Sequence, residues 1–399
     1  MSETRQILAG IRILDMSIMT AGPCGTQLLG DLGADVIKVE QPGSGDYSRG
    51  LGFTKIAGIN TQFLSQNRNK RSLTLNLNSP EGREVFFRLV PTADVVVENF
   101  RPGTVTKLGV DYDSLKRVKP DIIYVSISAF GQTGPYSLLP ANDPVVQAIG
   151  GLMSVTGEEG GGPVRVGNPA PDFGTGALVA SGIMAALLRR QRTGEGQKLE
   201  LSLLDTTLFS LVPMEGEFFA TGALPPRMGS ARKDFAPTGS FETADGKSIY
   251  LSVFTEEAWG NLCAVLGHPE WREEPLFQDN AGRVRNRRGL HDRIRRCLLE
   301  KSLAEWGKRL DRHDVPWAPV HTVTEALHDP QTRHNGMLVE MSHPVAGPIT
   351  LMGHPAKFET TPAQYRLPPP GLGEHAEEIL RKASYTDEQI RGLRERKVT

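Results

Sequence analysis

The chain has 399 residues, of which 39% are hydrophobic and 23% charged, a composition typical of a folded globular protein with one large or two moderate domains. Lysine and arginine number 45 and aspartate and glutamate 46, so the net charge of -1 gives no field that would favour nucleic acid or an anionic membrane. Three widely separated cysteines (Cys24, Cys263 and Cys297) exclude a disulfide framework and favour a reducing compartment.

The first five residues are polar and lack the apolar core of a signal peptide. The longest apolar runs are far shorter than a membrane span. We therefore expect a cytoplasmic protein that does not insert into a membrane.

Strands and helices alternate over the first 200 residues. Runs of β-branched residues predict strands at 11–15, 36–40, 72–77, 94–98 and 121–127, with helices at 22–32 and 80–90. This alternation predicts an α/β domain with a parallel sheet that is covered on both faces. Ligands of such sheets bind beyond the carboxyl ends of the strands, and these ends carry residues 15–22, 40–46, 99–103 and 126–134.

The pattern changes after residue 205. Residues 206–235 have no clear period and are interpreted as a linker that contains a helix. A hairpin over 239–243 and 248–253, followed by helices at 256–266, 289–299 and 302–310, predicts a small α+β domain at 236–322. Residues 323–399 are strand-like and proline-rich and end in a charged helix near 386–395.

Asp172 is the strongest candidate for chemistry. It follows a glycine-rich loop and precedes a helix predicted over 177–190. A carboxylate at a helix N-terminus is stabilised by free N–H groups and by the helix dipole, so we expect it to stay ionised near neutral pH. Such a carboxylate is suited to nucleophilic attack, although an ordinary helix N-cap is the alternative.

All nine histidines lie at or after His268. A Ser-His-Asp catalytic triad or a Cys-His catalytic dyad confined to the N-terminal α/β region is therefore excluded. No metal-ligand spacing and no phosphate-binding loop occurs, and we expect no metal.

The glycine-rich segment 157–163 lacks the order of a dinucleotide fingerprint and is either a lid or a plain surface loop. Cys24 is interpreted as a small buried residue. Basic residues near strand ends, most densely at 67–71, suit a phosphate-bearing ligand if they share one crevice.

Eleven different short motifs follow one another along nearly the whole chain. They occupy residues 13–15, 21–23, 32–40, 42–46, 69–72, 97–103, 131–135, 172–176, 192–197, 315–320 and 372–375. In this order they resemble the class III CoA-transferases, the family of formyl-CoA transferase, the carnitine CoA-transferases and α-methylacyl-CoA racemase.

The resemblance implies a large α/β domain with a parallel Rossmann-like sheet, built from residues 1–205 and the returning tail 323–399. Residues 206–235 would link it to an inserted small α+β domain at 236–322. It also implies a homodimer whose two chains interlock like linked rings.

The resemblance makes Asp172 the catalytic nucleophile. It would form a mixed anhydride with an acyl-CoA and then an aspartyl-CoA thioester, from which an acceptor acid takes CoA. Residues 160–176 would supply N–H donors to the oxyanions. Coenzyme A is then a substrate, and no cofactor is expected. The substrate and CoA contacts implied by matching positions are Thr20, Ala21, Gln41, Leu75, Asn99, Phe100, Lys107 and Asn142.

Two features separate branches of the family. Asn142 stands where the racemases carry a histidine base, and an amide cannot accept the α-proton, so transfer is favoured over epimerisation. Asp143 is interpreted as the N-cap of the next helix.

Residues 227–232 resemble the corresponding stretch of the succinyl-CoA-using dicarboxylate transferases, which implies succinyl-CoA and an acceptor such as itaconate, malate or glutarate. Arg165, Arg227 and Arg232 are candidates for binding it. An enolising racemase-type enzyme and a non-catalytic CoA-binding homologue are the alternatives.

Overall fold

The computed structural model describes residues 6–52 and 54–399, which form two compact units. The first unit contains the chain up to Gly150, Val166–Val212 and Pro330–Thr399, and the second contains Gly151–Arg165 and Pro213–Asp329. The chain therefore leaves the first unit twice and returns to it twice. Residues 151–165, which the sequence places within the large domain, belong to the second unit.

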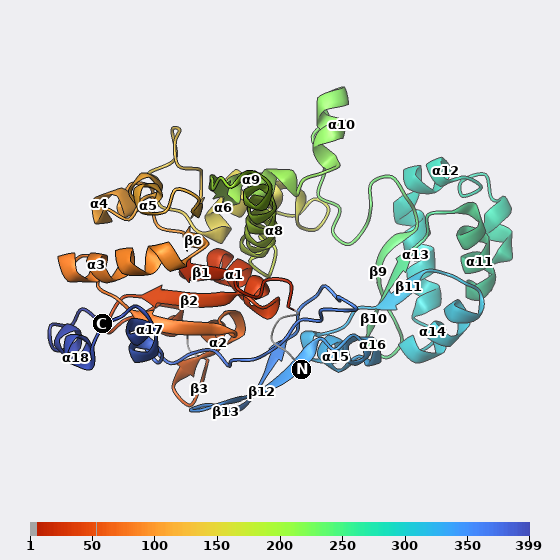
Figure 1. The fold of residues 1–399 in the computed structure, drawn as a ribbon. Helices are drawn as coiled ribbons and strands as arrows, with labels where there is room; N and C mark the ends of the chain where they lie inside the picture. The colour runs from red at the N-terminus through yellow and green to blue at the C-terminus, as the bar shows by residue number, and fades with distance from the viewer. Residues whose placement is uncertain (1–5, 53) are drawn as a thin grey trace. The chain divides into compact units, whose positions relative to one another are not determined.

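A six-stranded parallel sheet forms the centre of the first unit (Figure 1). Its order is β5-β2-β1-β6-β7-β8, so all strands run parallel and the order in which the chain adds them reverses between β1 and its neighbour β6. The strands are β1 (Arg12–Asp15), β2 (Asp35–Glu40), β5 (Lys70–Thr74), β6 (Val95–Glu98), β7 (Ile123–Ser128) and β8 (Lys198–Ser202). The predicted parallel sheet is confirmed. The strand expected at 72–77 starts and ends earlier, and β8 was not predicted.

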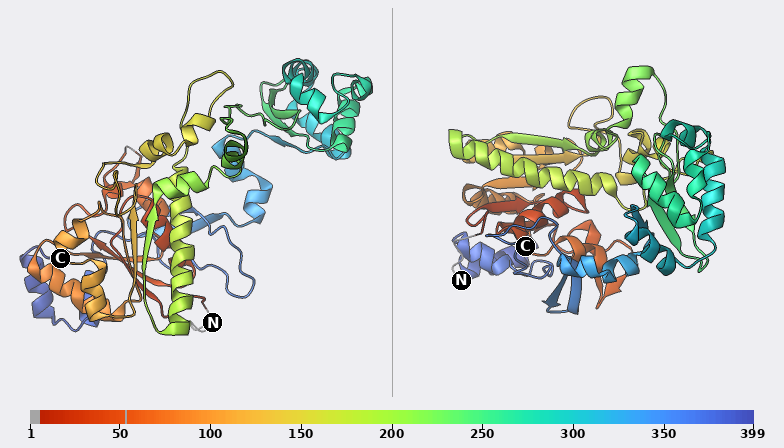
Figure 2. Two further views of the ribbon diagram at one scale, coloured as in Figure 1. Left: turned by 90° about the horizontal axis from the view of Figure 1, so that it is seen from above. Right: turned by 90° about the vertical axis from the view of Figure 1, so that its right-hand side faces the viewer.

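Helices cover both faces of this sheet, which explains the almost continuous apolar character of its inner strands. Leu14 and Ile37 point to one face and Ile13 and Val36 to the other. The first face is covered by α3 (Pro80–Leu89), α5 (Tyr112–Val118), α17 (Ala376–Lys382) and α18 (Asp387–Glu395). The second is covered by α1 (Ala21–Asp31), α6 (Asp143–Ile149), α8 (Ala170–Thr193) and α9 (Leu203–Phe209). In the left view of Figure 2 the blue C-terminal helices and the yellow-green α8 lie on opposite sides of the strands.

Smaller elements complete the first unit. Two short hairpins are formed by β3 (Lys55–Ile56) with β4 (Ile59–Asn60) and by β12 (Leu338–His343) with β13 (Gly347–Met352). The short helices are α2 (Thr61–Gln66), α4 (Thr104–Leu108) and α16 (Pro330–His334). Leu64 of α2 packs on Ile349 and Leu351 of β13, so the C-terminal segment contributes to the core of this unit.

The second unit has its own sheet and core. The predicted hairpin is confirmed as β9 (Thr238–Glu242) paired with β10 (Ser248–Ser252), and β11 (Trp317–Pro319) extends it on the other side of β10. Trp259, Trp306 and Leu262 lie in the buried core beside these strands. The helices are α7 (Leu152–Val155), α10 (Met214–Thr221), α11 (Glu256–Leu266), α12 (Asn280–Arg285), α13 (Arg287–Leu298), α14 (Leu303–Arg312) and α15 (Val323–His328).

Helix α8 is longer than expected because it begins seven residues before the predicted start, at Ala170. With 24 residues it is long and apolar enough to cross a membrane by length and composition, contrary to the expectation that no apolar segment reaches that length. A core helix meets the same criteria. Val179 and Ile183 are fully buried against the sheet, so one side of α8 has the packing of a core helix.

Two glycines allow α1 and α8 to cross with their backbones in contact. A Cβ atom on Gly25 would lie 2.7 Å from the carbonyl oxygen of Gly176 and 2.7 Å from the side chain of Val179. A Cβ atom on Gly176 would lie 3.0 Å from the carbonyl oxygen of Ala21 and 3.1 Å from Cβ of Cys24. This crossing holds the first turns of α8 against the start of α1.

Buried charges join the strand ends. Lys70 of β5 pairs with Asp15 of β1 at 3.0 Å, and Lys38 of β2 pairs with Asp46 at 2.7 Å, with all four side chains fully buried. Burial alone would raise the pKa of Asp15, but Lys70, Lys38 and the hydroxyls of Ser17 and Thr26 outweigh this effect and lower the pKa to about 2. Lys38 also donates to the carbonyl of Ser17 at 2.8 Å, so the network fixes the loops after β1 and β2.

Replacing Lys38 with methionine tests this network. The substitution keeps most of the side-chain volume but leaves Asp46 and Asp15 buried with less positive charge, so we expect the free energy of unfolding to fall by about 3–5 kcal/mol. Urea unfolding followed by circular dichroism at pH 7 measures it. Arg88→Gln, which breaks an exposed ion pair with Glu84, is the control and is expected to cost less than about 1 kcal/mol. Equal losses in the two variants would contradict the role of the network.

Candidate functional site

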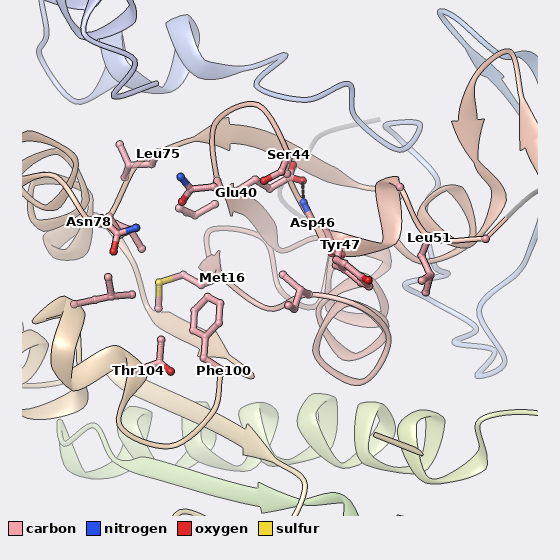
Figure 3. A pocket seen from close by; sticks show the side chains of 18 residues that line it. Met16, Glu40, Ser44, Asp46, Tyr47, Leu51, Leu75, Asn78, Phe100 and Thr104 are labelled. Atoms are coloured by element: carbon pink, nitrogen blue, oxygen red, sulfur yellow. Dashed lines mark hydrogen bonds between the residues drawn. The ribbon is translucent and has the colours of Figure 1, made fainter. Parts of the chain in front are cut away.

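A cavity of about 910 Å³ lies at the carboxyl ends of the strands in the first unit (Figure 3). It is formed by the segments that follow β1, β2, β5 and β6, so it occupies the point where the strand order reverses. The side chains of Met16, Leu75 and Phe100 supply much of its apolar wall. The residues that line it are Met16, Ile18, Val39, Glu40, Gln41, Ser44, Gly45, Asp46, Tyr47, Gly50, Leu51, Gly52, Leu75, Leu77, Asn78, Phe100, Thr104 and Leu108.

The structure brings together three of the residues proposed from sequence to bind substrate or CoA: Gln41, Leu75 and Phe100 all line the cavity. The other five proposed residues do not line the cavity: Thr20, Ala21, Asn99, Lys107 and Asn142. Sequence reasoning missed lining residues such as Met16, Tyr47 and Thr104, although they lie in or beside the strand-end segments that the strand pattern had marked.

Some of the remaining predicted residues lie beside the cavity and contact or adjoin the residues that line it. Asn99 exchanges two hydrogen bonds with the backbone of Ile18, accepting from its N–H at 2.8 Å and donating to its carbonyl at 2.7 Å. Thr20 and Ala21 are buried at the start of α1. Lys107 is exposed on α4, between the lining residues Thr104 and Leu108.

The basic cluster at 67–71 does not face a ligand. Arg68 forms a buried pair with Asp31 at 2.6 Å, Lys70 pairs with Asp15, and Arg71 pairs with Asp35 at 2.7 Å. The hypothesis that these residues bind phosphate is therefore wrong, because their charges are neutralised inside the first unit. Among residues 6–52 and 54–399, no lysine or arginine lines the cavity.

Asp172 lies in the first turn of α8 and does not cap the helix. The N-cap position is Pro169, with no side-chain cap hydrogen bond, so the alternative of Asp172 as an N-cap is wrong. The backbone N–H of Asp172 instead donates to Oδ2 of Asp143 at 3.3 Å. Asp143 therefore receives the N–H group that was expected to stabilise Asp172.

The Asp172 side chain is half-buried, and its ionisation differs from the expectation. Burial, reinforced by the negative charge of Asp143, raises the pKa of Asp172 to about 7. The expectation that the helix N-terminus keeps this carboxylate ionised near neutral pH is wrong, because desolvation and a like charge outweigh the dipole. A carboxylate that is stabilised so little by its surroundings is a stronger base and nucleophile when it ionises.

The neighbours of Asp172 come from α1 and α6. Asn142, not Asp143, is the N-cap of α6, and its side chain accepts from the N–H of Val145 at 3.4 Å, so the predicted cap is off by one residue. Asp143 is 5% exposed and faces the start of α8. Cys24 of α1 is half-buried, and burial raises the pKa of its thiol.

The glycine-rich segment 157–163 belongs to the second unit, where Arg227 holds it. The guanidinium of Arg227 donates to the carbonyl of Gly161 at 2.6 Å and to that of Ser154 at 3.1 Å, and the N–H of Gly229 donates to the carbonyl of Gly157 at 2.8 Å. Arg227, expected to bind a dicarboxylate, is thus bonded to main chain.

Comparison with known proteins gives one consistent family. The profile of CoA-transferase family III matches residues 8–376. The chain is 35% identical to the "Succinyl-CoA:glutarate CoA-transferase" of Mus musculus over 96% of this chain and 87% of that protein. It is 34% identical to a "Formyl-CoA:oxalate CoA-transferase" of Rhodopseudomonas palustris over 96% of this chain and 95% of that one. A CAIB/BAIF family protein from Brucella suis has a similar structure, with a TM-score of 0.87, 34% identity and coverage of 95% of this chain and 99% of that one.

The raised pKa of Asp172 predicts a pH-dependent effect on stability. An aspartate in an unfolded chain has a pKa of about 3.9, so ionised Asp172 destabilises the fold, and the penalty grows from about pH 4 to about pH 7 and is constant above that. Asp172→Asn removes the penalty. We expect a larger gain in melting temperature at pH 8.5 than at pH 5, of roughly 2–4 °C per kcal/mol recovered. Scanning calorimetry at both pH values measures it, and an equal or smaller gain at pH 8.5 would contradict the assignment.

Proposed function

This chain belongs to CoA-transferase family III and is an acyl-CoA:carboxylate CoA-transferase, and we propose that Asp172 is the nucleophile that carries the acyl group and then CoA. The observation that carries this proposal is the state of the Asp172 side chain. It lies in the first turn of α8, is not used as a cap, and is half-buried with a raised pKa. A structural aspartate at a helix start would instead accept backbone N–H groups.

The proposed reaction proceeds through two intermediates. An Oδ atom of ionised Asp172 attacks the thioester carbonyl of the donor, the C–S bond breaks, and CoA leaves as a thiolate, which gives a mixed anhydride. The thiolate then attacks the carboxyl carbon of Asp172, the C–O bond breaks, and the donor acid leaves as a carboxylate, which gives an aspartyl-CoA thioester. The acceptor carboxylate repeats these steps in reverse and restores Asp172. We propose that N–H groups of residues 160–176 stabilise the oxyanions.

The cavity at the strand ends supports a site for the nucleotide end of CoA. Its apolar wall suits the adenine ring, and no basic residue lines it, so we propose that the phosphates lie at its rim beside Lys107. Gln41, Leu75 and Phe100 would contact the nucleotide directly. Asn99 would hold the loop after β1, whereas Thr20, Ala21 and Asn142 would be nearer the reacting end.

We propose succinyl-CoA as donor and a dicarboxylic acid such as glutarate, malate or itaconate as acceptor. The mouse relative described above is named for succinyl-CoA and glutarate, which supports this choice. The Arg227 guanidinium is bonded to the main chain, which leaves it fewer donors for a distal carboxylate. Asn142 supports transfer over epimerisation because its amide caps α6 and is no base.

We also propose an interlocked homodimer. Large apolar side chains are exposed on residues 208–212 of the first unit, and within and just after α10 in the second unit, which is unusual for a monomer surface. They are Leu208, Phe209, Val212, Met214, Phe218, Phe219 and Leu224. Sedimentation equilibrium tests this proposal, and a monomer at micromolar concentration would contradict it.

Asp172→Ala tests the proposed nucleophile. We expect transfer to fall by at least about 10³-fold because no covalent intermediate can form, while binding of CoA changes little. Steady-state assays and calorimetric titration with CoA measure the two effects. Asp205→Ala, which changes an exposed aspartate at the start of α9, is the control and is expected to stay active. Transfer by Asp172→Ala at the wild-type rate would refute the proposal.

A panel of free acids offered with succinyl-CoA tests the substrate. We expect new CoA esters from C4 and C5 dicarboxylic acids, with kcat/KM at least about tenfold above that for acetate or formate, because a second carboxylate gains a charge-assisted pair. Mass spectrometry of the products measures it. A preference for monocarboxylic acids or oxalate would contradict the assignment.

A further inference from the structure

The side chain of Gln147 joins the helix that carries Asp143 to the loop that leads to Asp172. It lies one turn along α6 and is fully buried. Its Nε2 atom donates to Oδ1 of Asp143 at 2.7 Å, and its Oε1 atom accepts from the N–H of Val166 at 2.8 Å. The other carboxylate oxygen of Asp143 accepts from the N–H of Asp172. One buried amide therefore connects the two ends of the segment 166–172, by one hydrogen bond to Val166 and by two successive hydrogen bonds through Asp143 to Asp172.

Only an amide of this length satisfies both partners. Asp143 presents an acceptor and Val166 a donor, so the residue between them needs one N–H group and one carbonyl. A carboxylate at position 147 would face the carboxylate of Asp143, and an apolar side chain would remove the hydrogen bond to the buried Oδ1 of Asp143 and the one from the part-buried N–H of Val166. The two bonds also determine which way the amide of Gln147 points.

The position of Val166 in the chain gives this amide a second role. The chain enters the second unit after Gly150 and returns to the first unit at Val166. The bond between Gln147 and Val166 joins the two ends of this excursion within the first unit. Within the second unit, Arg227 and Gly229 bind the main chain of the excursion. Six residues after its return, the same chain reaches Asp172.

We propose that Gln147 is a positioning residue for CoA transfer, holding both Asp143 and the return of the 151–165 excursion so that Asp172 is presented in one geometry. This inference rests on the proposed role of Asp172 as the nucleophile. Gln147 does not contact the reacting atoms. It acts through Asp143, which binds the N–H of Asp172, and through Val166, which fixes the start of the loop.

The consequence is a loss of rate and not of substrate binding. A nucleophile displaced by about 1 Å loses on the order of 10²-fold in rate. Releasing Asp143 also changes the charge that Asp172 experiences. In the described part of the chain the charge that raises the pKa of Asp172 is that of Asp143 from α6, and Asp172 in turn raises the pKa of the Cys24 thiol of α1. A movement of Asp143 therefore changes the pH dependence of the reaction.

Two variants at this position test the proposal. Gln147→Met keeps the length but removes both bonds, and we expect kcat to fall roughly 10–100-fold with KM for the acyl-CoA within about threefold of wild type. The acid limb of the kcat/KM profile is expected to move to lower pH as the charge of Asp143 moves away. Gln147→Glu adds a negative charge beside Asp143 and is expected to move the same limb up by roughly one pH unit.

Gln27→Met is the matched control. Gln27 is also a buried glutamine of the first unit whose amide makes two hydrogen bonds. Both of them go to main chain, since the amide accepts from the N–H of Arg68 at 3.0 Å and donates to the carbonyl of Ser65 at 3.2 Å. Its loss is expected to lower the melting temperature as much as Gln147→Met does, with kcat within about twofold of wild type and an unmoved acid limb.

Measurements on properly folded protein, checked by circular dichroism, separate the outcomes. Equal kcat values and equal pH profiles for Gln147→Met and Gln27→Met would overturn the positioning role. Should Gln147→Met fail to fold, Gln147→Glu gives the same answer, because an acid limb at the wild-type pH overturns the proposal as well. Activity retained by Asp172→Ala would refute the nucleophile itself and is thereby distinguished from a failure at Gln147.

Discussion

The contact between Gly25 of α1 and Gly176 of α8 determines where the carboxylate of Asp172, the proposed nucleophile, lies. With no side chain on either residue, the two backbones touch, and a single added Cβ on Gly25 would come within 2.7 Å of a carbonyl oxygen. Helix α1 begins at the loop after β1, beside the cavity, and Asp172 lies one turn before Gly176. The crossing therefore brings a residue from the end of a long loop to the carboxyl ends of the strands, where ligands of such sheets bind.

The electrostatics of this site depend on which of two aspartates, Asp143 or Asp172, accepts the backbone N–H at the start of α8. Asp143 accepts the N–H of Asp172 in the first turn of α8, and at Asp172 desolvation and the charge of Asp143 outweigh the stabilisation that a helix start offers. The result is a carboxylate that is costly to ionise, at the expense of fold stability at neutral pH. The same property makes the ionised form more reactive, and such a trade between stability and reactivity is common at functional sites.

Most of the fold could be predicted from the sequence, because β-branched runs and helical spacing are local signals. Strand β8 was missed because it lies at the sheet edge and mixes charged and apolar residues, and α8 was started too late because Pro169 and two glycines resemble a loop. Asp172 was proposed as the nucleophile from its sequence context. Its pKa was not, because desolvation and the approach of Asp143 depend on segments 29 residues apart in the chain. Buried ion pairs at residues 68–71 were missed for the same reason.

Isotope transfer into the enzyme tests the central claim most directly. An acceptor acid labelled with 18O in both carboxylate oxygens is incubated with the enzyme and a donor acyl-CoA, and the peptide that contains Asp172 is then weighed by mass spectrometry. If Asp172 forms an anhydride with the acceptor, its carboxylate retains one oxygen of that acid after one turnover, and the peptide gains the mass of one 18O-for-16O exchange. Repeated turnovers raise the gain to two exchanges, because both oxygens of Asp172 can react. Turnover that leaves this peptide unlabelled would show that the acyl group never passes through Asp172.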